Sequence, residues 1–301
     1  MAETNETNEH TLRLRSGRID DVEEAGRIIF ESFATIAEKH GFPPDFPSVD
    51  VGRTSAASFL SNPGFYSVIA EDTSSGGKVV GSSFIDERSS IAGVGPLTVD
   101  PIYQNKGVGR RLMNDVMERV RNRNFPGTRL LQASYHNRSL ALYARLGFEV
   151  REPISTMQGK PIQEAIPGRT VRPATESDVE SCNAVCKAVH GHDRNGELLD
   201  SIRQGTARVV LHADKITGYT SGMAFFSHSV GLTNDDLKAL IGSADSYRGP
   251  GILIPTRNTH LFPHLFHWCL DRGLRLVQQL ILMTVGMYNE PAGAYMPSVL
   301  Y

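Results

Sequence analysis

Apolar residues along the first half of the chain are spaced alternately as in helices and as in strands. Helical spacing runs over residues 21–39 and returns in "RRLMNDVMERV" and "NRSLALYARL", whereas "FYSVIAED" and "KVVGSSFID" hold the branched and aromatic runs typical of strands. This alternation predicts an α/β fold whose sheet has both parallel and antiparallel pairs. The expected helices are residues 21–39, 107–123 and 138–146, with a short helical stretch in "TSAASFL"; the expected strands are 66–71, 79–86, 92–99, 129–135 and 148–157.

The second half of the chain repeats the order of the first. Arg15 and Arg172 each stand six residues before an Asp-Val-Glu triplet that opens a helical pattern. Strand-like runs follow in both places ("FYSVIAED" and "ARVVLHAD"), and then a glycine-marked hairpin into a second strand. We interpret this as an internal duplication. The expected division is a flexible tail at residues 1–11, a first domain at 12–160 and a second at 168–301, joined by the Gly/Pro-rich segment 157–169.

The composition indicates a soluble globular protein with room for one large domain or two ordinary ones. Hydrophobic residues make up 40% of its 301 residues and charged residues 21%. A formal net charge of −2 argues against binding nucleic acid through overall basicity. The N-terminus does not resemble a secretory signal, and no apolar run reaches the length of a membrane span. Together with only three cysteines, this predicts a cytoplasmic protein without membrane or nucleic-acid partners.

The stretch "YQNKGVGRRL" carries the clearest chemical signal. It lies between a strand-like run and a helical one, so Gly107 and Gly109 mark a turn at the entry to a helix. The first amides of a helix have no intrahelical acceptor, and with the helix dipole they form an anion site, here strengthened by Lys106, Arg110 and Arg111. A pyrophosphate suits such a site. Taken alone, the glycines favour a simple tight loop, and the pattern is neither a dinucleotide-binding turn nor a P-loop.

The wider context resembles the coenzyme A loop of the GNAT N-acetyltransferase superfamily. "LTVDPIYQNKGVG" matches the family's strand ending in V-x-P and its Q/R-x-x-G-x-G/A loop. Further along, "NRSLALYARLGFEV" resembles the second hallmark, an Asn-started helix with a tyrosine, then Gly-Phe and a strand. The resemblance covers residues 12–157. It implies tandem GNAT-like domains, each with a mixed, largely antiparallel central sheet flanked by helices, and it implies acetyl-CoA as cosubstrate with no metal.

The resemblance also assigns roles to individual residues. The loop amides would hold the pyrophosphate, with Gln104 at the loop entry, and the end of the preceding strand would pair its main chain with the pantetheine arm. Asn137 would cap the second helix or touch the pantetheine, although it precedes Tyr143 by six residues where many family members have seven. The loop residues are Lys106, Gly107, Val108, Gly109 and Arg110, and the strand residues are Leu97 and Val99.

Acetyl transfer to an amine needs a base for the ammonium, a donor for the oxyanion and an acid for the departing thiolate. Tyr143 is the expected general acid, because a phenol is comparable to a thiol in basicity; the same residue also suits the inner face of an amphipathic helix. A backbone N–H near Val99 would serve the oxyanion. The base stays open between Glu31, Asp86, Glu87 and a water chain, because the strand before the loop has no central carboxylate.

The second half lacks these features. After "GMAFFSHSVG" the chain continues with "LTNDDLKALIG", which has no G-x-G, no basic flank and two aspartates that would repel a phosphate. Aligning Gly273 with Gly147 puts Cys269 at the position of Tyr143. We therefore expect a degenerate copy that has lost the coenzyme site and that shapes the substrate pocket, orients the first domain or forms a dimer interface.

Three other clusters favour structural roles. His260, His264 and His267, with Cys269 nearby, have the spacing of ligands on a helix, but no four-ligand zinc pattern closes around them, so we expect no metal. Cys182 and Cys186 are expected to be small core residues. A basic run is expected to form a solvated face, with contact to the adenosine 3′-phosphate as the alternative; it consists of Arg119, Arg121, Arg123 and Arg129.

The function predicted from these observations is N-acetyl transfer from acetyl-CoA directly to a primary amine, on a small molecule or a peptide. Asp45 and Asp50, in the loop after the first helix, would suit a cationic amine, which covers amino acids, polyamines, aminoglycosides and protein lysines. The alternatives are a catalytically silent acetyl-CoA-binding sensor or scaffold and a nucleotide-phosphate protein of another fold. A homodimer is one option for its assembly.

Overall fold

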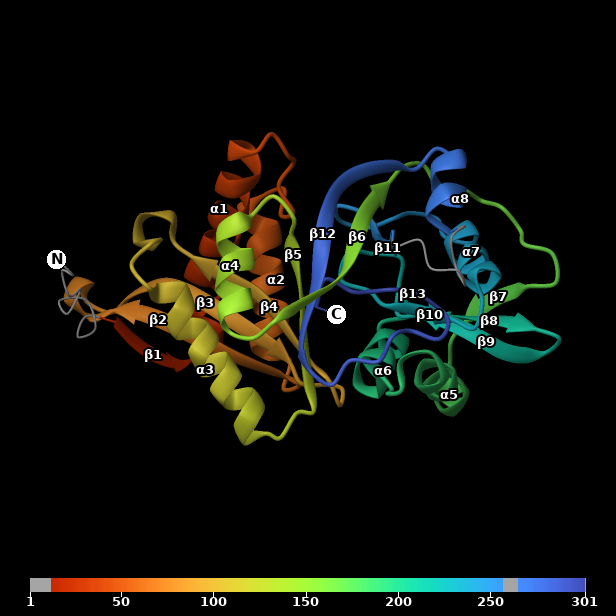
Figure 1. Ribbon diagram of the computed structural model, residues 1–301, viewed down its shortest axis with the longest axis horizontal. Coiled ribbons are helices and arrows are strands. Elements are labelled where there is room, and N and C mark those ends of the chain that lie inside the picture. Colours follow the sequence, from red (N-terminus) through yellow and green to blue (C-terminus); the bar gives the residue numbers. More distant parts are fainter. Residues whose placement is uncertain (1–11, 257–264, 301) are drawn as a thin grey trace. The chain divides into compact units, whose positions relative to one another are not determined.

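The structure is a computed structural model that describes residues 12–256 and 265–300. The chain forms two compact units (Figure 1). The first runs up to Glu87 and takes in Val94–Phe125, and the second combines Arg88–Gly93 with the chain from Pro126 onward. The boundaries of these units differ from those of the expected domains 12–160 and 168–301, which follow the sequence repeat.

The first unit is a sheet with helices. Its strands lie in the order β1-β2-β3-β4, and β2 pairs antiparallel with both β1 and β3. The strands are β1 (Leu12–Ser16), β2 (Phe65–Asp72), β3 (Lys78–Asp86) and β4 (Ala92–Val99, whose first two residues belong to the second unit); the helices are α1 (Val22–Lys39), α2 (Val49–Ser61) and α3 (Val108–Asn122), with 3₁₀ turns η2 (Ile19–Asp21), η3 (Thr73–Ser75) and η4 (Pro101–Tyr103).

Helix α3 forms because its apolar residues recur on one face. Val108, Leu112, Met113, Val116 and Val120 are buried, at the spacing that a helix turns toward a core. Arginines lie in its last turn, where they complement the negative end of the helix dipole. The sequence prediction of a helix over 107–123 is therefore confirmed to within a residue at each end.

In the second unit, four strands lie in the order β5-β12-β6-β11, and every neighbouring pair is antiparallel (Figure 1). A strand from the second half of the chain therefore lies between two strands from the first half. If Gly147 is aligned with Gly273, as the sequence repeat implies, β5 corresponds to β11 and β6 corresponds to β12. The order β5-β12-β6-β11 then meets corresponding strands in the same succession from either end. The strands are β5 (Gly127–Ala133), β6 (Glu149–Gln158), β11 (Ile252–Pro255) and β12 (Arg275–Gly286), and the helices beside them are α4 (Asn137–Arg145) and α8 (Leu265–Asp271).

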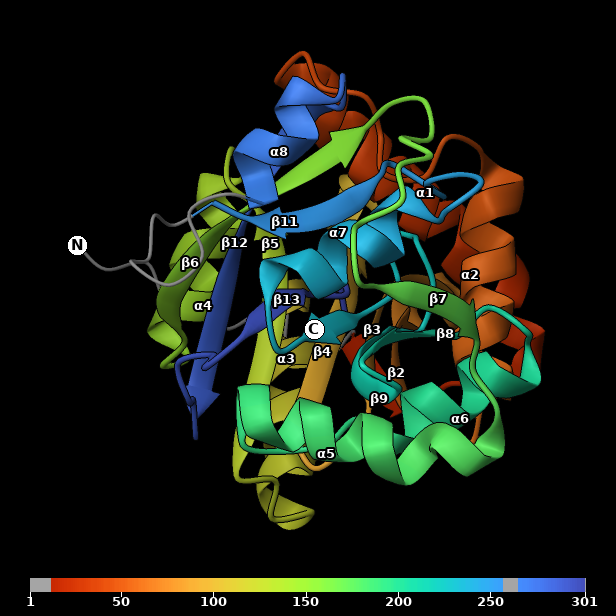
Figure 2. The same ribbon diagram turned by 90° about the vertical axis from the view of Figure 1, so that its right-hand side faces the viewer.

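A second sheet of five strands lies in the same unit, in the order β13-β10-β9-β8-β7. Helices α5 and α6 lie on one side of it and α7 on the other (Figure 2). Val209 packs with the α5 residues, whereas the next residue, Val210, packs with the α7 residues, as alternation along a strand requires. The elements are β7 (Thr170–Pro173), β8 (Arg208–His212), β9 (Lys215–Thr220), β10 (Ser229–Gly231) and β13 (Ala294–Met296), with η5 (Glu176–Asp178), α5 (Val179–His190), α6 (Asn195–Arg203) and α7 (Asn234–Gly242).

An ion pair that the sequence repeat singled out recurs in both halves. Both guanidinium Nη atoms of Arg15 donate to the carboxylate of Asp21 at 2.7 Å, and Arg172 makes the same pair of 2.7 Å bonds to Asp178. Each aspartate also accepts a backbone N–H three residues upstream at 2.8 Å. The pair fixes the first strand of each half to the start of the following helix, so the repeated sequence signature has one structural cause.

Candidate functional site

The N-terminus of α3 has no side-chain cap. Gly107 occupies the N-cap position with a left-handed backbone (φ 83°), and no acidic residue lies in the first turn. A side chain at position 107 would meet no described atom within 4 Å, so the positive φ alone is what favours glycine there. No side chain of the described residues caps the first amides of α3, and Lys106 and Arg110, at either end of the turn, add positive charge.

The segment that leads into this turn is held by buried carboxylates. The Oδ1 of Asp100 accepts the backbone N–H of Ile102 at 3.0 Å, and its Oδ2 accepts from Nη2 of Arg27 on α1 at 3.0 Å. The Tyr103 hydroxyl donates to Asp72 at 3.0 Å, and Nζ of Lys106 lies 5.0 Å from the centre of the Tyr103 ring. The loop backbone and the lysine are thus fixed to the ends of β2 and β4.

Asp72 is ionised at any ordinary pH. The hydroxyl groups of Ser74 and Ser75, followed by that of Tyr103, donate to its carboxylate and lower its pKa to about 2. Tyr103 therefore donates to a permanent negative charge, which favours charge-assisted bonding over a neutral contact.

The end of β4 presents its main chain on the side away from β3. Asp100 donates its N–H to the Val80 carbonyl at 2.9 Å, and because successive residues alternate, Leu97 and Val99 direct their main-chain groups to the opposite side. The Val99 carbonyl accepts from the Ser32 hydroxyl at 2.9 Å and from Nε2 of Gln104 at 3.2 Å. Gln104 therefore ties the loop entry to the strand end.

Tyr143 lies on α4, in the second unit. Its side chain is 8% exposed, and its ring centre lies 6.0 Å from that of Phe148. Burial raises the pKa of this phenol, so it keeps its proton well above neutral pH. Helix α4 begins at Asn137 and its N-cap is His136, so the structure does not show Asn137 as the cap.

The carboxylates considered as the base are engaged with other groups. Glu31 forms an ion pair with Arg27 on the same helix. Glu87 accepts from Nε and Nη2 of Arg119 at 2.8 and 2.9 Å. Asp86 is buried at the end of β3. If Glu31 or Glu87 were the base, the proton of the amine would therefore compete with an arginine for the lone pairs of that carboxylate.

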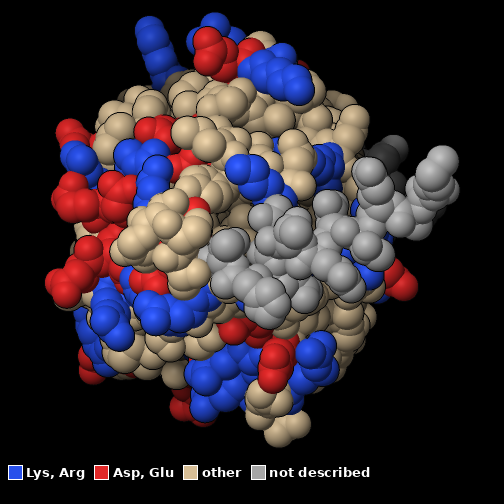
Figure 3. Space-filling model, turned by 90° about the vertical axis from the view of Figure 1, so that its left-hand side faces the viewer, with Lys and Arg blue, Asp and Glu red and all other residues tan. Residues whose placement is uncertain are grey.

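The expectation of one solvated basic face is wrong for Arg129. This side chain is only 1% exposed, and desolvation lowers its pKa to about 10, with its guanidinium 5.2 Å from the Tyr288 ring centre. Arg119 is bound to Glu87 and lies 4.8 Å from the Tyr66 ring centre. On the face drawn in Figure 3, blue and red side chains are interspersed, with no single-sign field.

In the second half, a carboxylate of the protein fills the corresponding helix end. Asp236, fully buried in the first turn of α7, accepts the N–H of Thr233 at 2.9 Å through Oδ2 and a bond from Thr217 at 2.6 Å through Oδ1. Arg169 donates to the same Oδ1 at 2.7 Å. Cys269, at the position aligned with Tyr143, is a buried residue of α8 with a pKa that desolvation raises to about 12.

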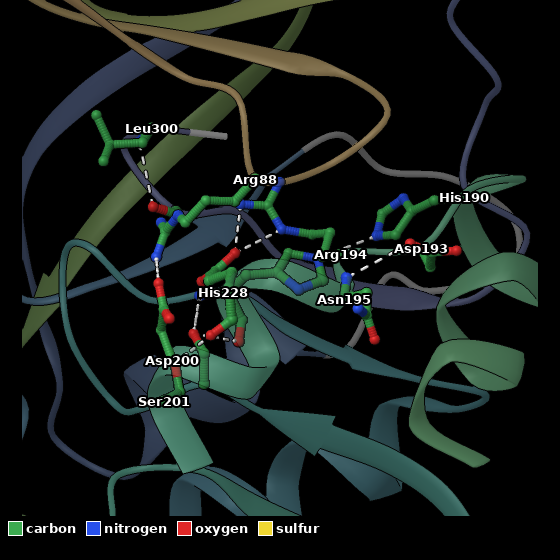
Figure 4. A network of polar contacts seen from close by, with 12 residues as sticks. Arg88, His190, Asp193, Arg194, Asn195, Asp200, Ser201, His228 and Leu300 are labelled. Atoms are coloured by element: carbon green, nitrogen blue, oxygen red, sulfur yellow. Dashed lines mark hydrogen bonds and ion pairs between the residues drawn. The ribbon is translucent and has the colours of Figure 1, made fainter. Parts of the chain in front are cut away.

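A buried polar network in the second unit gave no periodic signal in the sequence (Figure 4). The Nε2 atoms of His190 and His228 lie 3.2 Å apart. Glu197 accepts from Nε of Arg194 at 2.7 Å and from the Ser221 hydroxyl at 2.7 Å. These residues come from α5, α6 and the segment around β10, which only the fold brings together.

Nothing in the described ranges groups three metal-binding side chains, and His260 and His264 of the histidine row lie outside those ranges. Among the described helices, none combines the length and the apolar character that crossing a membrane requires.

Comparisons with known proteins agree with this geometry. A protein from Pyrococcus horikoshii named as a candidate acetyltransferase shares 17% identity with the chain, a TM-score of 0.73 and 97% coverage of each chain. A GCN5-related N-acetyltransferase from Sphaerobacter thermophilus has 15% identity and a TM-score of 0.62, with 93% of this chain and 96% of the other covered. A tandem GNAT protein from the clavulanic acid biosynthesis pathway has 15% identity and a TM-score of 0.54, covering 91% and 98%. No curated protein matches the chain significantly.

The fold is therefore that of the tandem GNAT proteins. Residues 32–148 match the model of the acetyltransferase (GNAT) family.

Proposed function

We propose that the first half of this protein transfers an acetyl group from acetyl-CoA to a primary amine. The uncapped N-terminus of α3 supports this best. Its glycine N-cap, acid-free first turn and neighbouring Lys106 and Arg110 suit the pyrophosphate of the coenzyme. In α7, the corresponding helix of the second half, the buried carboxylate of Asp236 lies at the N-terminus instead.

In this proposal the chain contributes orientation and one proton. The loop amides from Lys106 to Arg110 bind the pyrophosphate, and Leu97 and Val99 offer main-chain groups to the pantetheine arm. As the amine nitrogen bonds to the acetyl carbon and the carbon–sulfur bond breaks, the Tyr143 hydroxyl gives its proton to the sulfur. Its hydroxyl keeps its proton at neutral pH, as a general acid must. The amine loses its proton to Glu31, Asp86, Glu87 or water.

The experiment is a thiol-release assay with acetyl-CoA and a panel of amines: amino acids, polyamines, aminoglycosides and lysine peptides. We expect release with at least one class. Isothermal calorimetry with coenzyme A is run beside it, because binding without release supports the sensor, and absence of binding refutes both. ATP in place of coenzyme A tests the nucleotide-phosphate alternative.

The carboxylates between α1 and the start of α2 support a cationic acceptor. Asp45 is buried there, whereas Asp50 is exposed and bound to Arg53 at 3.2 Å. Either carboxylate is a candidate for an ammonium partner. We place the reaction in the cytoplasm as part of the same proposal.

A further inference from the structure

Asp72, at the end of β2, accepts one more hydrogen bond than its own turn requires. Its carboxylate caps the 3₁₀ turn η3: Oδ1 accepts the N–H of Ser74 at 2.9 Å and its hydroxyl at 2.6 Å, and Oδ2 accepts the hydroxyl of Ser75 at 2.9 Å. These three bonds close a local turn, as an aspartate at such a position commonly does. A fourth donor, the hydroxyl of Tyr103, reaches Oδ2 at 3.0 Å from 31 residues further along the chain. This bond joins the turn after β2 to the segment before α3.

The turn that carries Tyr103 does not need this hydroxyl for its own closure. Asp100 caps η4 by accepting the N–H of Ile102 at 3.0 Å, and the N–H of Tyr103 donates to the Asp100 carbonyl at 2.8 Å. Both bonds are made by main-chain donors of η4 and would remain if residue 103 were phenylalanine. The hydroxyl bond therefore fixes the orientation of the ring rather than the path of the backbone.

The ring of Tyr103 lies next to two ammonium groups. Nζ of Lys106 is 5.0 Å from the ring centre and Nζ of Lys78 is 5.8 Å from it. Lys78 also lies 4.0 Å from Oδ2 of Asp100, whereas Lys106 is exposed, directly before the glycine N-cap of α3. A lysine has a long, flexible stem, so a ring held in one orientation narrows the positions that its ammonium takes.

The backbone between Tyr103 and α3 has an uncommon conformation. Asn105 has a φ of 65° and Gly107 a φ of 83°, so a left-handed residue lies on each side of Lys106. Asparagine enters this region more readily than most residues, and such a conformation persists where the surrounding contacts hold it. Tyr103 is the residue at the start of this segment that a side-chain bond ties to another part of the unit.

We propose that Asp72 and Tyr103 position Lys106 for the pyrophosphate of the coenzyme; this rests on the proposed function. The carboxylate holds the ring, the ring holds the ammonium, and the ammonium meets the phosphate. Because Lys106 is ordered before the ligand arrives, binding loses less side-chain entropy. Asp72 and Tyr103 are positioning residues in this scheme, and both belong to the same unit as Lys106.

A double-mutant cycle between Tyr103 and Lys106 tests the proposal. Tyr103→Phe keeps the ring but removes its bond to Asp72, and Lys106→Met removes the cation while keeping a long side chain. Calorimetry with coenzyme A should show about five-fold weaker binding for Tyr103→Phe and about ten-fold weaker binding for Lys106→Met. The variant with both changes should bind like Lys106→Met alone, because the orientation of the ring no longer matters once the ammonium is gone.

Ser75→Ala is the matched control. It removes a 2.9 Å bond to the same Oδ2 of Asp72 and leaves Tyr103 and Lys106 unchanged. The melting temperatures of Ser75→Ala and Tyr103→Phe should fall by similar amounts, whereas only Tyr103→Phe should lose affinity for coenzyme A. If the bonds to Asp72 served stability alone, the two variants would have equal affinities.

Unchanged affinity in Tyr103→Phe would overturn the proposal, as would a loss of affinity that persists in the Lys106→Met background. If Tyr103→Phe does not fold, Asp72→Asn takes its place in the same cycle and is judged by the same affinities. A wild-type protein that binds no coenzyme A would refute the proposed function, and this proposal with it.

Discussion

Arg169 donates from its Nε to Oδ1 of Asp236 at 2.7 Å, and this pair closes the helix end at which a second coenzyme would bind. In α3 the same position is left to backbone amides and cations, whereas in α7 a carboxylate of the chain accepts the amide hydrogen. The two halves therefore differ at this helix N-terminus: in α7 the chain itself supplies the negative charge, and in α3 it does not.

One coenzyme A per chain is the expected stoichiometry, because a phosphate at α7 would meet the negative charge of Asp236. Calorimetry at saturating ligand measures it directly. A second site of comparable affinity would contradict the assignment of the second half as degenerate.

Asp236→Ala should destabilise the fold by about 3–5 kcal/mol, because it leaves Arg169 with a partly buried, uncompensated charge. Urea unfolding measures the change. Asp235→Ala is the control: Asp235 is exposed and bonds only to Lys238 at 2.9 Å in the described structure, so its loss should cost less than about 1 kcal/mol. Equal losses in the two variants would be inconsistent with this reading.

Gly107→Val should abolish measurable binding of coenzyme A. A branched residue in the left-handed region costs about 1–2 kcal/mol and shifts the loop away from the geometry that aims its amides. Gly205→Val supplies the comparison, because Gly205 has a φ of 69° and likewise open space around it. It should lose similar stability and retain coenzyme affinity; retained affinity in Gly107→Val would rule out the loop as the anion site.

Tyr143→Phe should lower kcat by about a hundred-fold and leave the affinity for coenzyme A nearly unchanged. The raised pKa of Tyr143 means that the acid form persists as pH rises, so the wild-type rate should not fall through loss of this proton up to about pH 10. Tyr66→Phe, which removes a 2.7 Å bond to Asp115, is the control and should keep kcat. A kcat equal to the wild type in Tyr143→Phe would exclude the residue from the reaction.

Stability should fall on mild acidification because of the histidines in the second unit. Desolvation, with the charges of Arg129 and Arg194, lowers the pKa of His190 and His228 well below 6.5 and that of His192 to about 4. Below pH 6.5 these histidines become protonated in the unfolded chain but stay neutral in the folded chain. The free energy of unfolding should therefore drop as pH falls from 6.5 toward 4, by about 1.4 kcal/mol per pH unit for each such proton.

Urea titrations at pH 7, 6 and 5 check this slope. In His228→Asn the free energy of unfolding should depend less steeply on pH, since one histidine with a lowered pKa has been removed. Identical slopes would show that these histidines do not control acid stability.

The amino-acid sequence carried enough local information to place the elements of the first half and the turn at α3. Apolar spacing, the Gly107 turn and the repeated arginine–aspartate pairs each act within a few residues, and the structure has the predicted strands and helices there. The run "LRLVQQLILMTVGMY" forms one strand, β12, over Arg275–Gly286.

The sequence by itself determined where the chain turns, which faces are apolar and which helix start lacks a cap, because these depend on residues that are neighbours along the chain. Only the tertiary structure decided that β12 lies between β5 and β6, that Arg169 reaches Asp236, and that Arg129 and Gln132 are buried. Strand partners and burial depend on segments distant in sequence, and many pairings satisfy the same local pattern until the whole core is packed.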